Sequence, residues 1–517
     1  MAKAQKNRAS KHPYVSPSQL TLVGFESPFS QSLDPNNRWV MLAHKIPWDI
    51  LVSTYEGQLN NSSMGADGIN PRVAIGAMIL KHMCNMSDRE TVLQIQENMY
   101  MQYFIGYSSF STDPPFDPSL FVDFRKRLGI DQINFINENI LGLSHAKSDS
   151  HSDDKSDTNK PDGESQATES NVTEVLPAEN LVTHKGKLIT DATACPQDIA
   201  YPTDLNLLSN AREKTEELID KLYDESRHGI KPRTYRKVAR KEYLKTAQLK
   251  KKSKKQVHNA VKKQLGYLRR NINSVNQLLD EYDQCPLNRK DRKYLMVINT
   301  LYEQQYTMFK EDTHQVDHRI VSIHQPHVRP IVRGKTNAYV EFGAKINVSL
   351  MNGFAFLDDF SWEAFNEGTR LMSTVEKYKQ RFGYYPEEVL ADKIYCNRTN
   401  RASLKLLGIK LIAKPLGRPR AVDVEHVRPG ERNPIEGKFG QAKTAYGLNR
   451  IKARLDQTSE SWIATIILVL NLVKLIGSST YCQILSMVTF STEWLVELYR
   501  RKLSQVMAPA NLELRPC

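Results

Sequence analysis

The sequence contains little cysteine and no long uninterrupted apolar run. Its six cysteines are widely spaced without a C-x-x-C pair, so neither a disulfide framework nor a thiolate zinc site is expected. No apolar core follows the basic residues 1–10, so no secretory signal is expected. The longest apolar run, 462–476, is interrupted by Asn471 and Lys474 and is shorter than the roughly 18 residues of a membrane span. We predict a buried helix there, a reducing cytoplasm and no membrane.

Positive charge is abundant and unevenly distributed. The 517 residues suit two or three domains, and 71 Lys and Arg against 58 Asp and Glu give a net charge of +13. Residues 227–270 hold 17 Lys or Arg and one acid, Glu242. A solvated helix face is one interpretation, but such a face repels itself unless an anion lies on it. DNA contact is therefore favoured, and it includes the predicted DNA-binding residues Lys251, Lys252, Lys254 and Lys255.

Helical patterns dominate the chain as far as residue 144. Asn70-Pro71 predicts one helix start, and Ser87 with Glu90 has the spacing of a capping box that starts another. A third helix lies between Asp117-Pro118 and Gly129. Its predicted apolar face is Phe121, Phe124 and Leu128, and its predicted polar face is Arg125, Lys126 and Arg127. A DNA reader resembling a helix-turn-helix and a small helical bundle with solvated charge fit this pattern equally well.

After a polar stretch the pattern changes to strands alternating with helices. Residues 145–171 contain no Ile, Leu, Val or Phe, which predicts a disordered linker over 145–180. Strands are expected at 187–193, 319–332, 341–360, 388–395 and 409–413, with a helix at 397–407 closed by Gly408. A charge-rich helical segment occupies 205–312 between the first two strands. The predicted fold is an α/β domain, 181–204 with 313–480, interrupted by a basic helical insertion and followed by a helical tail at 481–517.

Three acids stand out by their positions. Asp191 ends the first predicted strand, Asp392 ends a later strand before a helix, and Glu436 lies in the first turn of a helix begun by Asn433-Pro434. Carboxylates at strand ends and on a nearby helix can converge above a sheet. Because such carboxylates repel one another, the cluster implies bound divalent cations. Two metal ions could then promote phosphoryl transfer on DNA.

Other acids nearby are alternatives to these three, and several bases are predicted to contact DNA beside them. Asp198 and Asp204 are rivals of Asp191, but Asp198 lies past the strand and Asp204 suits a helix cap. The Asp358-Asp359 pair is interpreted as ordinary exposed turn acids. Glu436 could itself be only a cap. Bases predicted to contact DNA are Lys443 and Arg450, spaced seven and fourteen residues beyond Glu436 on one helix face, and Arg418 and Arg420 in the Gly417–Arg420 loop.

Four passages resemble bacterial insertion-sequence DDE transposases, in the branch similar to insertion sequences four and five. They are NPIEGKFGQAKTAYGLNR (433–450), MSDRETVLQIQENMYMQYFIG (86–106), DATACPQDIAYPTDLNLL (191–208) and the region from HRIVSIHQPHVRPIVRGK to EFGAK (318–345). They occur in family order. The first matches N-x-x-E-G-x-F-G followed by a lysine and Y-G-L-x-R.

The resemblance implies an RNase H-like α/β catalytic domain, preceded by an all-α N-terminal DNA-binding domain at 1–144. It implies Asp191, Asp392 and Glu436 as catalytic ligands of two Mg²⁺ or Mn²⁺ ions, with Lys443 as the downstream base. Arg432 matches the family's arginine before the glutamate and is expected to bind DNA, whereas Pro429 stands where a tyrosine is found.

The expected activity is strand cleavage and transfer at the terminal inverted repeats of an insertion sequence. The expected partners are transposon-end and target DNA, bound by a homodimer or higher oligomer in the bacterial cytoplasm at the nucleoid. Two alternatives stay open: a non-catalytic DNA-binding protein derived from a transposase, and a structure-selective nuclease that cuts without joining.

Overall fold

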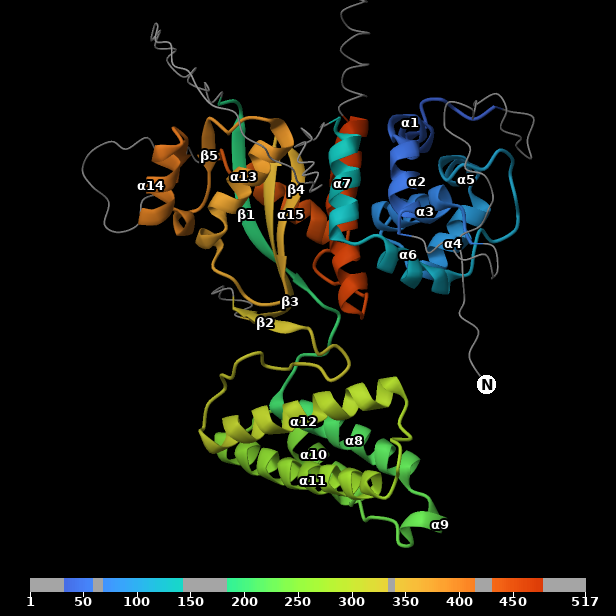
Figure 1. Cartoon of the computed structure of the whole chain (residues 1–517), viewed down its shortest axis with the longest axis vertical. Helices are drawn as coiled ribbons and strands as arrows, with labels where there is room; N and C mark the ends of the chain where they lie inside the picture. The colour runs from blue at the N-terminus through green and yellow to red at the C-terminus, as the bar shows by residue number, and fades with distance from the viewer. Residues whose placement is uncertain (1–31, 59–67, 143–183, 333–339, 414–429, 478–517) are drawn as a thin grey trace, which may run out of the picture. The chain divides into compact units, whose positions relative to one another are not determined.

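The structure is a computed structural model that describes residues 32–58, 68–142, 184–332, 340–413 and 430–477 (Figure 1). The chain divides into two compact units, one of residues 1–137 with 440–517 and the other of residues 138–439. Each unit is described separately below. The predicted linker, the predicted C-terminal tail, Arg418 and Arg420 lie outside the described residues.

The first unit is helical, as the sequence predicted for the N-terminal region. Asn70 caps a helix whose first residue is Pro71, and its side chain accepts a hydrogen bond from the Arg72 N–H. Ser87 caps the next helix by accepting from the Glu90 N–H at 3.1 Å. These two predicted helix starts are confirmed. The helices are α1 (Arg38–Lys45), α2 (Trp48–Glu56), α3 (Pro71–Met83), α4 (Asp88–Glu97), α5 (Met99–Phe104), α6 (Phe121–Arg127) and α7 (Ile130–Ile140), with the 3₁₀ turn η3 (Pro118–Leu120) before α6.

The apolar face predicted for α6 is buried, but its basic face is not uniformly solvated. Phe121, Phe124 and Leu128 are buried as expected. Arg125 is also buried, where it pairs with Asp88 of α4, so the prediction of an exposed arginine is wrong. Burial is tolerated because the guanidinium gains a carboxylate partner. The charge on this helix therefore serves partly to hold the helices of the unit together.

The longest apolar run forms the helix Asp456–Gly477. By length and composition this helix is apolar enough to cross a membrane, but 67% of its apolar window is buried within the structure. Trp462 packs edge-on against the His82 ring of α3, with ring centroids 4.7 Å apart. The buried side-chain amide of Asn471, inside the run, donates a hydrogen bond to the Asn137 side chain at 2.9 Å. This burial agrees with the prediction of a core helix.

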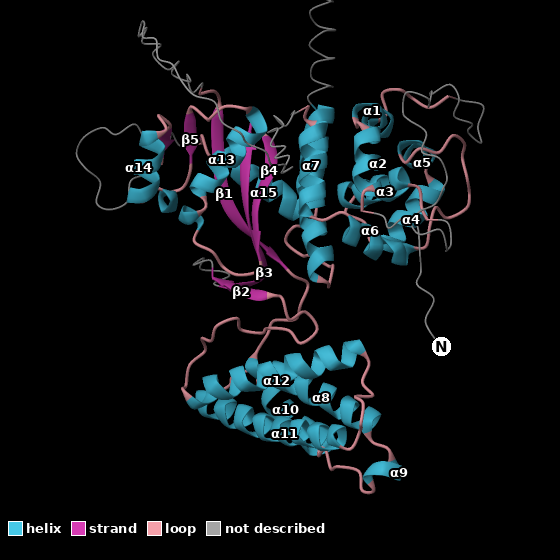
Figure 2. Ribbon diagram, viewed as in Figure 1, coloured by secondary structure: helices cyan, strands magenta, loops and turns pink. Residues whose placement is uncertain are grey.

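The second unit contains a mixed sheet of six strands (Figure 2). The strands are β1 (Lys187–Pro196), β2 (Arg329–Val332), β3 (Val340–Met351), β4 (Phe354–Ser361), β5 (Glu388–Leu390) and β6 (Lys410–Ile412). Their order is β2-β3-β1-β5-β6, with β4 also paired to β3. β1 runs antiparallel to β3 and parallel to β5. The predicted alternation of strands and helices is confirmed from β4 to β6, whereas β2, β3 and β4 follow one another without a helix between them. The strand pairing was not predicted from the sequence.

Three strand predictions need correction. The expected strand at 388–395 is reduced to β5, because Lys393–Tyr395 form a 3₁₀ turn. The expected strand at 319–332 is reduced to β2, because residues 319–328 form turns and irregular backbone. The expected strand at 341–360 is a hairpin of β3 and β4, reversed at Asn352 and Gly353. These two residues have φ of 49° and 77°, the left-handed pair that a two-residue hairpin turn requires. Asparagine and glycine are the residues that adopt this conformation most readily.

Helices α13 (Leu371–Phe382) and α14 (Arg398–Leu406) belong to the core that β1 and β5 form. Gly408 follows α14 with φ of 70°, which confirms the predicted helix closure. Asp358, expected to be an exposed turn acid, is buried in β4 and pairs with Arg381 of α13. That expectation is wrong because the arginine that neutralises Asp358 comes from a separate helix.

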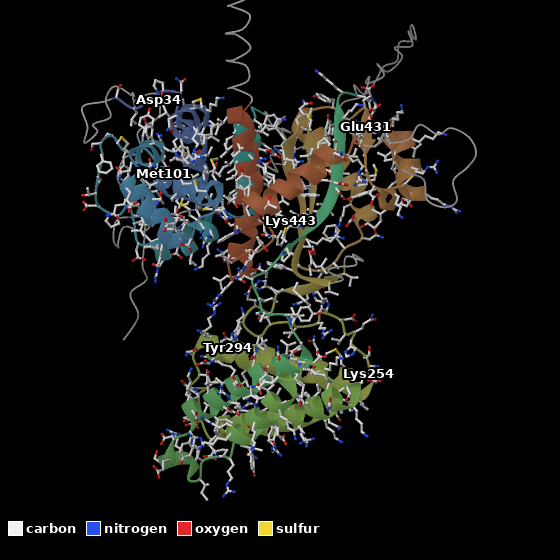
Figure 3. All side chains as sticks on the ribbon, turned by 180° about the vertical axis from the view of Figure 1, so that it is seen from behind. Asp34, Met101, Lys254, Tyr294, Glu431 and Lys443 are labelled. Carbon is white, nitrogen blue, oxygen red and sulfur yellow. The ribbon has the colours of Figure 1, made fainter. Side chains whose placement is uncertain are left out.

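Helices α8 to α12 interrupt the sheet between β1 and β2 and form a bundle with its own apolar core. They are α8 (Asp204–Leu222), α9 (Glu225–His228), α10 (Arg236–Ala247), α11 (Lys254–Asp280) and α12 (Arg289–Lys310). Thr203, not Asp204, caps α8, so that prediction is wrong; Asp204 instead pairs with Arg319 at 2.7 Å. Figure 3 shows Lys254 and Tyr294 at opposite ends of this bundle.

Candidate active site

Asp191 lies within a long strand rather than at its end. β1 continues to Pro196, paired with Gly343 of β3, so the prediction that Asp191 ends the strand is wrong. β3 is twelve residues long, and its pairing with β1 continues past the short apolar run that predicted the first strand. The Asp191 side chain is 18% exposed, and its Oδ1 accepts a hydrogen bond from the Ala192 N–H at 2.9 Å.

Asp392 follows the neighbouring strand at a matching position. In the parallel pairing of β1 with β5, Ile189 lies opposite Leu390. Asp191 and Asp392 are each two residues further along, and side chains repeat on one face every two residues. Asp392 caps the 3₁₀ turn η5 (Lys393–Tyr395) by accepting the Lys393 N–H at 2.7 Å. The register thus directs both carboxylates to the same side of the sheet.

Arg432 joins the two aspartates. Its Nη2 lies 3.1 Å from Asp191 Oδ2, and its Nη1 lies 3.4 Å from Asp392 Oδ1. The residue immediately precedes α15 (Asn433–Ala445), the helix that carries Glu436 in its first turn. The Arg432 side chain is 19% exposed, and its Nε is buried without a hydrogen-bond partner among the described residues. One guanidinium therefore bridges carboxylates from two separate strands.

Burial dominates the electrostatics of Asp191. Burial raises the pKa of Asp191 from 3.8 to about 6, against the opposing effects of the Ala192 N–H and Arg432. The negative charges of Glu367 and Asp392 raise it further. Since a buried carboxylate prefers to be neutral, the ionised form needs a cation beside it. The site is therefore built to hold positive charge.

A buried polar network lies next to the segment of β1 that carries Asp191. The Tyr395 hydroxyl donates to Asn347 Oδ1 at 3.1 Å, and the Asn347 amide donates to Thr374 at 2.9 Å. Burial, with the charges of Glu367 and Asp191, raises the pKa of Tyr395, so it remains a neutral donor. Asn347 stands opposite Ala192 in β3. The sequence reasoning missed this network because its members are adjacent only after the strands pair.

Glu367 is an acid near Asp191 that the sequence reasoning also missed. It begins the 3₁₀ turn η4 (Glu367–Thr369) and pairs with Lys345 of β3 at 2.9 Å. Its charge affects both Asp191 and Tyr395. The only sequence feature that pointed toward Glu367 was its partner Lys345, which ends one of the passages that resemble transposases.

The three predicted carboxylates do not form one cluster in the structure. Glu436 is exposed in the first turn of α15, which confirms the predicted helix start at Asn433-Pro434. Among the described residues no group of three or more His, Cys, Asp or Glu side chains could hold a metal ion. Asp191 and Asp392 nevertheless offer oxygen donors around one cationic group. That donor set suits Mg²⁺ or Mn²⁺, which proteins often bind through one or two carboxylates with water and substrate phosphates.

The predicted DNA contacts lie on several elements. Lys443 is on α15 (Figure 3), but Arg450 lies beyond the helix, which ends at Ala445. The prediction that one helix carries both is wrong because Gly447, with φ of 73°, turns the chain. In the insertion, a cavity of about 800 Å³ has a lysine-rich lining. The lysines lining this cavity are Lys252, Lys254, Lys255 and Lys310.

Comparisons with known proteins agree with the motifs. Residues 389–473 match a family model described as a transposase DDE domain, and residues 27–127 match one described as a transposase domain (DUF772). The first range contains Asp392, Arg432 and Glu436. Both matches are to transposase domains, which confirms the resemblance to an insertion-sequence DDE transposase.

A curated relative matches over a shorter span. It is an uncharacterized protein, ORF8 in the nfe locus of Rhizobium meliloti, with 33% identity over 97 residues. The alignment covers 19% of this chain and 46% of the relative, so it spans about half of that protein. No solved structure matches the chain.

Proposed function

We propose that this transposase catalyses metal-dependent DNA strand cleavage and transfer at the terminal inverted repeats of an insertion sequence. The observation that carries the proposal is the convergence of Asp191, within β1, and Asp392, just beyond β5, on the guanidinium of Arg432. In this proposal the sheet, with its helical insertion, is an RNase H-like catalytic domain. We also propose that the protein belongs to the branch of transposases similar to insertion sequences four and five.

Asp191 and Asp392 would hold the divalent cation, and Glu436 would complete the ligand set once α15 and DNA are in place. The bound Mg²⁺ or Mn²⁺ would supply a nucleophile and stabilise the leaving oxygen at the scissile phosphate. The Tyr395–Asn347 network holds the strand positions around Asp191. Arg432, Lys443 and the lysines of the insertion would bind DNA phosphates. The active form would be a dimer or higher oligomer paired on DNA in the bacterial cytoplasm.

Substitution of Asp392 tests the proposal. The full-length protein with Mn²⁺ should nick duplex DNA taken from the flanks of this reading frame. Asp392→Asn should reduce nicking at least about a hundredfold, since loss of a metal ligand exceeds the effect of its supporting groups. DNA binding, measured by gel shift, should be retained. The matched control is Asp198→Asn, an exposed rival acid, which should nick as the wild type does.

A non-catalytic DNA-binding protein is the second candidate function. It is favoured by the absence of a three-acid group among the residues that the structure describes. Wild-type protein that binds the flanking DNA but gives no Mn²⁺-dependent nick would support this candidate and refute the first. Nicking without joined product would instead indicate a structure-selective nuclease.

A further inference from the structure

Arg432 occupies the position between the two aspartates where a cation would be expected. Its two terminal nitrogens contact different carboxylates, at 3.1 Å and 3.4 Å, from strands that are paired in parallel. Asp191 divides its oxygens between two donors, because Oδ1 accepts the Ala192 N–H and Oδ2 faces Arg432. Asp392 Oδ1 receives both Arg432 and the Lys393 N–H. The guanidinium therefore stands in for a bound cation.

We propose that Arg432 is an exchangeable counter-cation, which holds Asp191 and Asp392 in the metal-free protein and leaves for a phosphate when DNA binds. Metal loading would then depend on DNA. This inference rests on the proposed function, since it takes the two aspartates as metal ligands. Arg432 is a positioning residue in this scheme, because it acts through the carboxylates rather than on the reacting atoms.

Like-charge repulsion makes the exchange necessary. A guanidinium in contact with both carboxylates and a divalent cation bound to the same oxygens would repel each other at close range. Without either cation, the largely buried Asp191 would carry an uncompensated charge. Occupancy by one of the two cations at a time satisfies both conditions.

A DNA phosphate is a suitable second partner for Arg432. A guanidinium binds phosphate and carboxylate with the same two-pronged geometry, so the exchange replaces one oxyanion by another. Arg432 lies directly before α15, whose first turn carries Glu436. A phosphate that draws Arg432 away would thus lie near the helix that brings the third carboxylate. DNA binding and metal binding become coupled, and the coupling must be reciprocal.

The first test measures Mn²⁺ binding without DNA, using the spin-resonance signal of free Mn²⁺ and full-length protein. Arg432→Gln should bind Mn²⁺ about tenfold more tightly than the wild type, since the cation no longer displaces two charge-assisted contacts. Lys187→Gln is the matched control, because it removes one charge and one ion pair with Glu388 from the same two strands. Its Mn²⁺ affinity should equal that of the wild type.

The second test adds duplex DNA from the flanks of the reading frame. DNA should tighten Mn²⁺ binding by the wild type more than by Arg432→Gln, after subtraction of Mn²⁺ bound by DNA alone, because only in the wild type does DNA also release the two aspartates from the guanidinium. If Arg432→Gln does not fold, Arg432→Lys should give a smaller gain in metal affinity without DNA, because an ammonium cannot bridge both carboxylates. Equal or weaker Mn²⁺ binding by the folded variant would overturn the inference.

The two proposals can fail separately. If Asp392→Asn abolishes nicking while Arg432→Gln leaves Mn²⁺ affinity unchanged, the counter-cation role fails and the active site stands. If Asp392→Asn nicks as the wild type does, the proposed active site fails. Mn²⁺ binding that is insensitive to both Asp191→Asn and Asp392→Asn overturns the assignment of the aspartates and the inference with it.

Discussion

Replacing Lys81 by methionine should make the stability of the helical unit less dependent on pH. Lys81 lies in α3 with its side chain only 2% exposed. Its Nζ contacts Asp88 at 2.9 Å and donates to the Met86 carbonyl at 2.7 Å. It also lies 4.6 Å from the centre of the Trp462 ring. Methionine retains the length and the apolar contacts of the side chain but removes its titration.

The sign and size of the effect follow from burial. Burial lowers the pKa of Lys81 from 10.5 to about 8, although Asp88 opposes the change. Between these two values the unfolded chain binds a proton that the folded protein does not, so stability rises with pH. The slope is about 1.4 kcal/mol per pH unit, or about 2 kcal/mol between roughly pH 8 and pH 9.5.

The measurement compares urea unfolding of the wild type and Lys81→Met over that range. Trp39, Trp48 and Trp462 report on this unit if Trp362 and Trp494 are replaced by phenylalanine in both proteins. The difference in unfolding free energy should rise by about 2 kcal/mol in favour of the wild type as pH increases. Both proteins retain Cys84 and the tyrosines, so those groups cancel. A difference independent of pH would refute the reasoning.

Two further predictions concern the second unit. Gly343→Ala should destabilise it by about 3 kcal/mol or more, since the added Cβ would lie 2.1 Å from the Cys195 carbonyl oxygen. Gly266→Ala in α11 should instead stabilise the protein by about 0.5 to 1 kcal/mol, because the added Cβ meets nothing within 4 Å. Thermal melting temperatures that shift in the same direction for both variants would contradict these two expectations. Replacing Lys252, Lys254 and Lys255 together by alanine should weaken DNA binding and reduce the salt slope of log affinity by about 2 to 3. Replacing Lys290 and Lys293, near Tyr294 at the other end of the bundle, is the control, and an equal loss there would show that the cavity has no special role.

Local signals in the sequence determined where many elements begin and end. Asn70-Pro71, Ser87, Gly408 and Asn433-Pro434 were interpreted correctly because caps and turns depend on backbone groups within a few residues. The same locality explains why the sequence indicated Asp392. It lies two residues beyond the end of the short strand β5 and caps the turn that follows.

Buried charges were not predicted, because their partners are distant in sequence. Arg125 pairs with Asp88, which is 37 residues away in the sequence, and Asp358 pairs with Arg381, which is 23 residues away. A charged side chain on a predicted surface and one that is neutralised in the core have the same local pattern. Only packing distinguishes them.

The sequence by itself determined the class of this protein and the residue types of its candidate site, since the transposase motifs are contiguous. The tertiary structure decided which of those residues meet. Arg432 reaches Asp191 across 241 residues, because the parallel pairing of β1 with β5 aligns the two aspartates and the start of α15 carries the guanidinium to them. Strand register and helix placement depend on long-range packing, which no local pattern encodes.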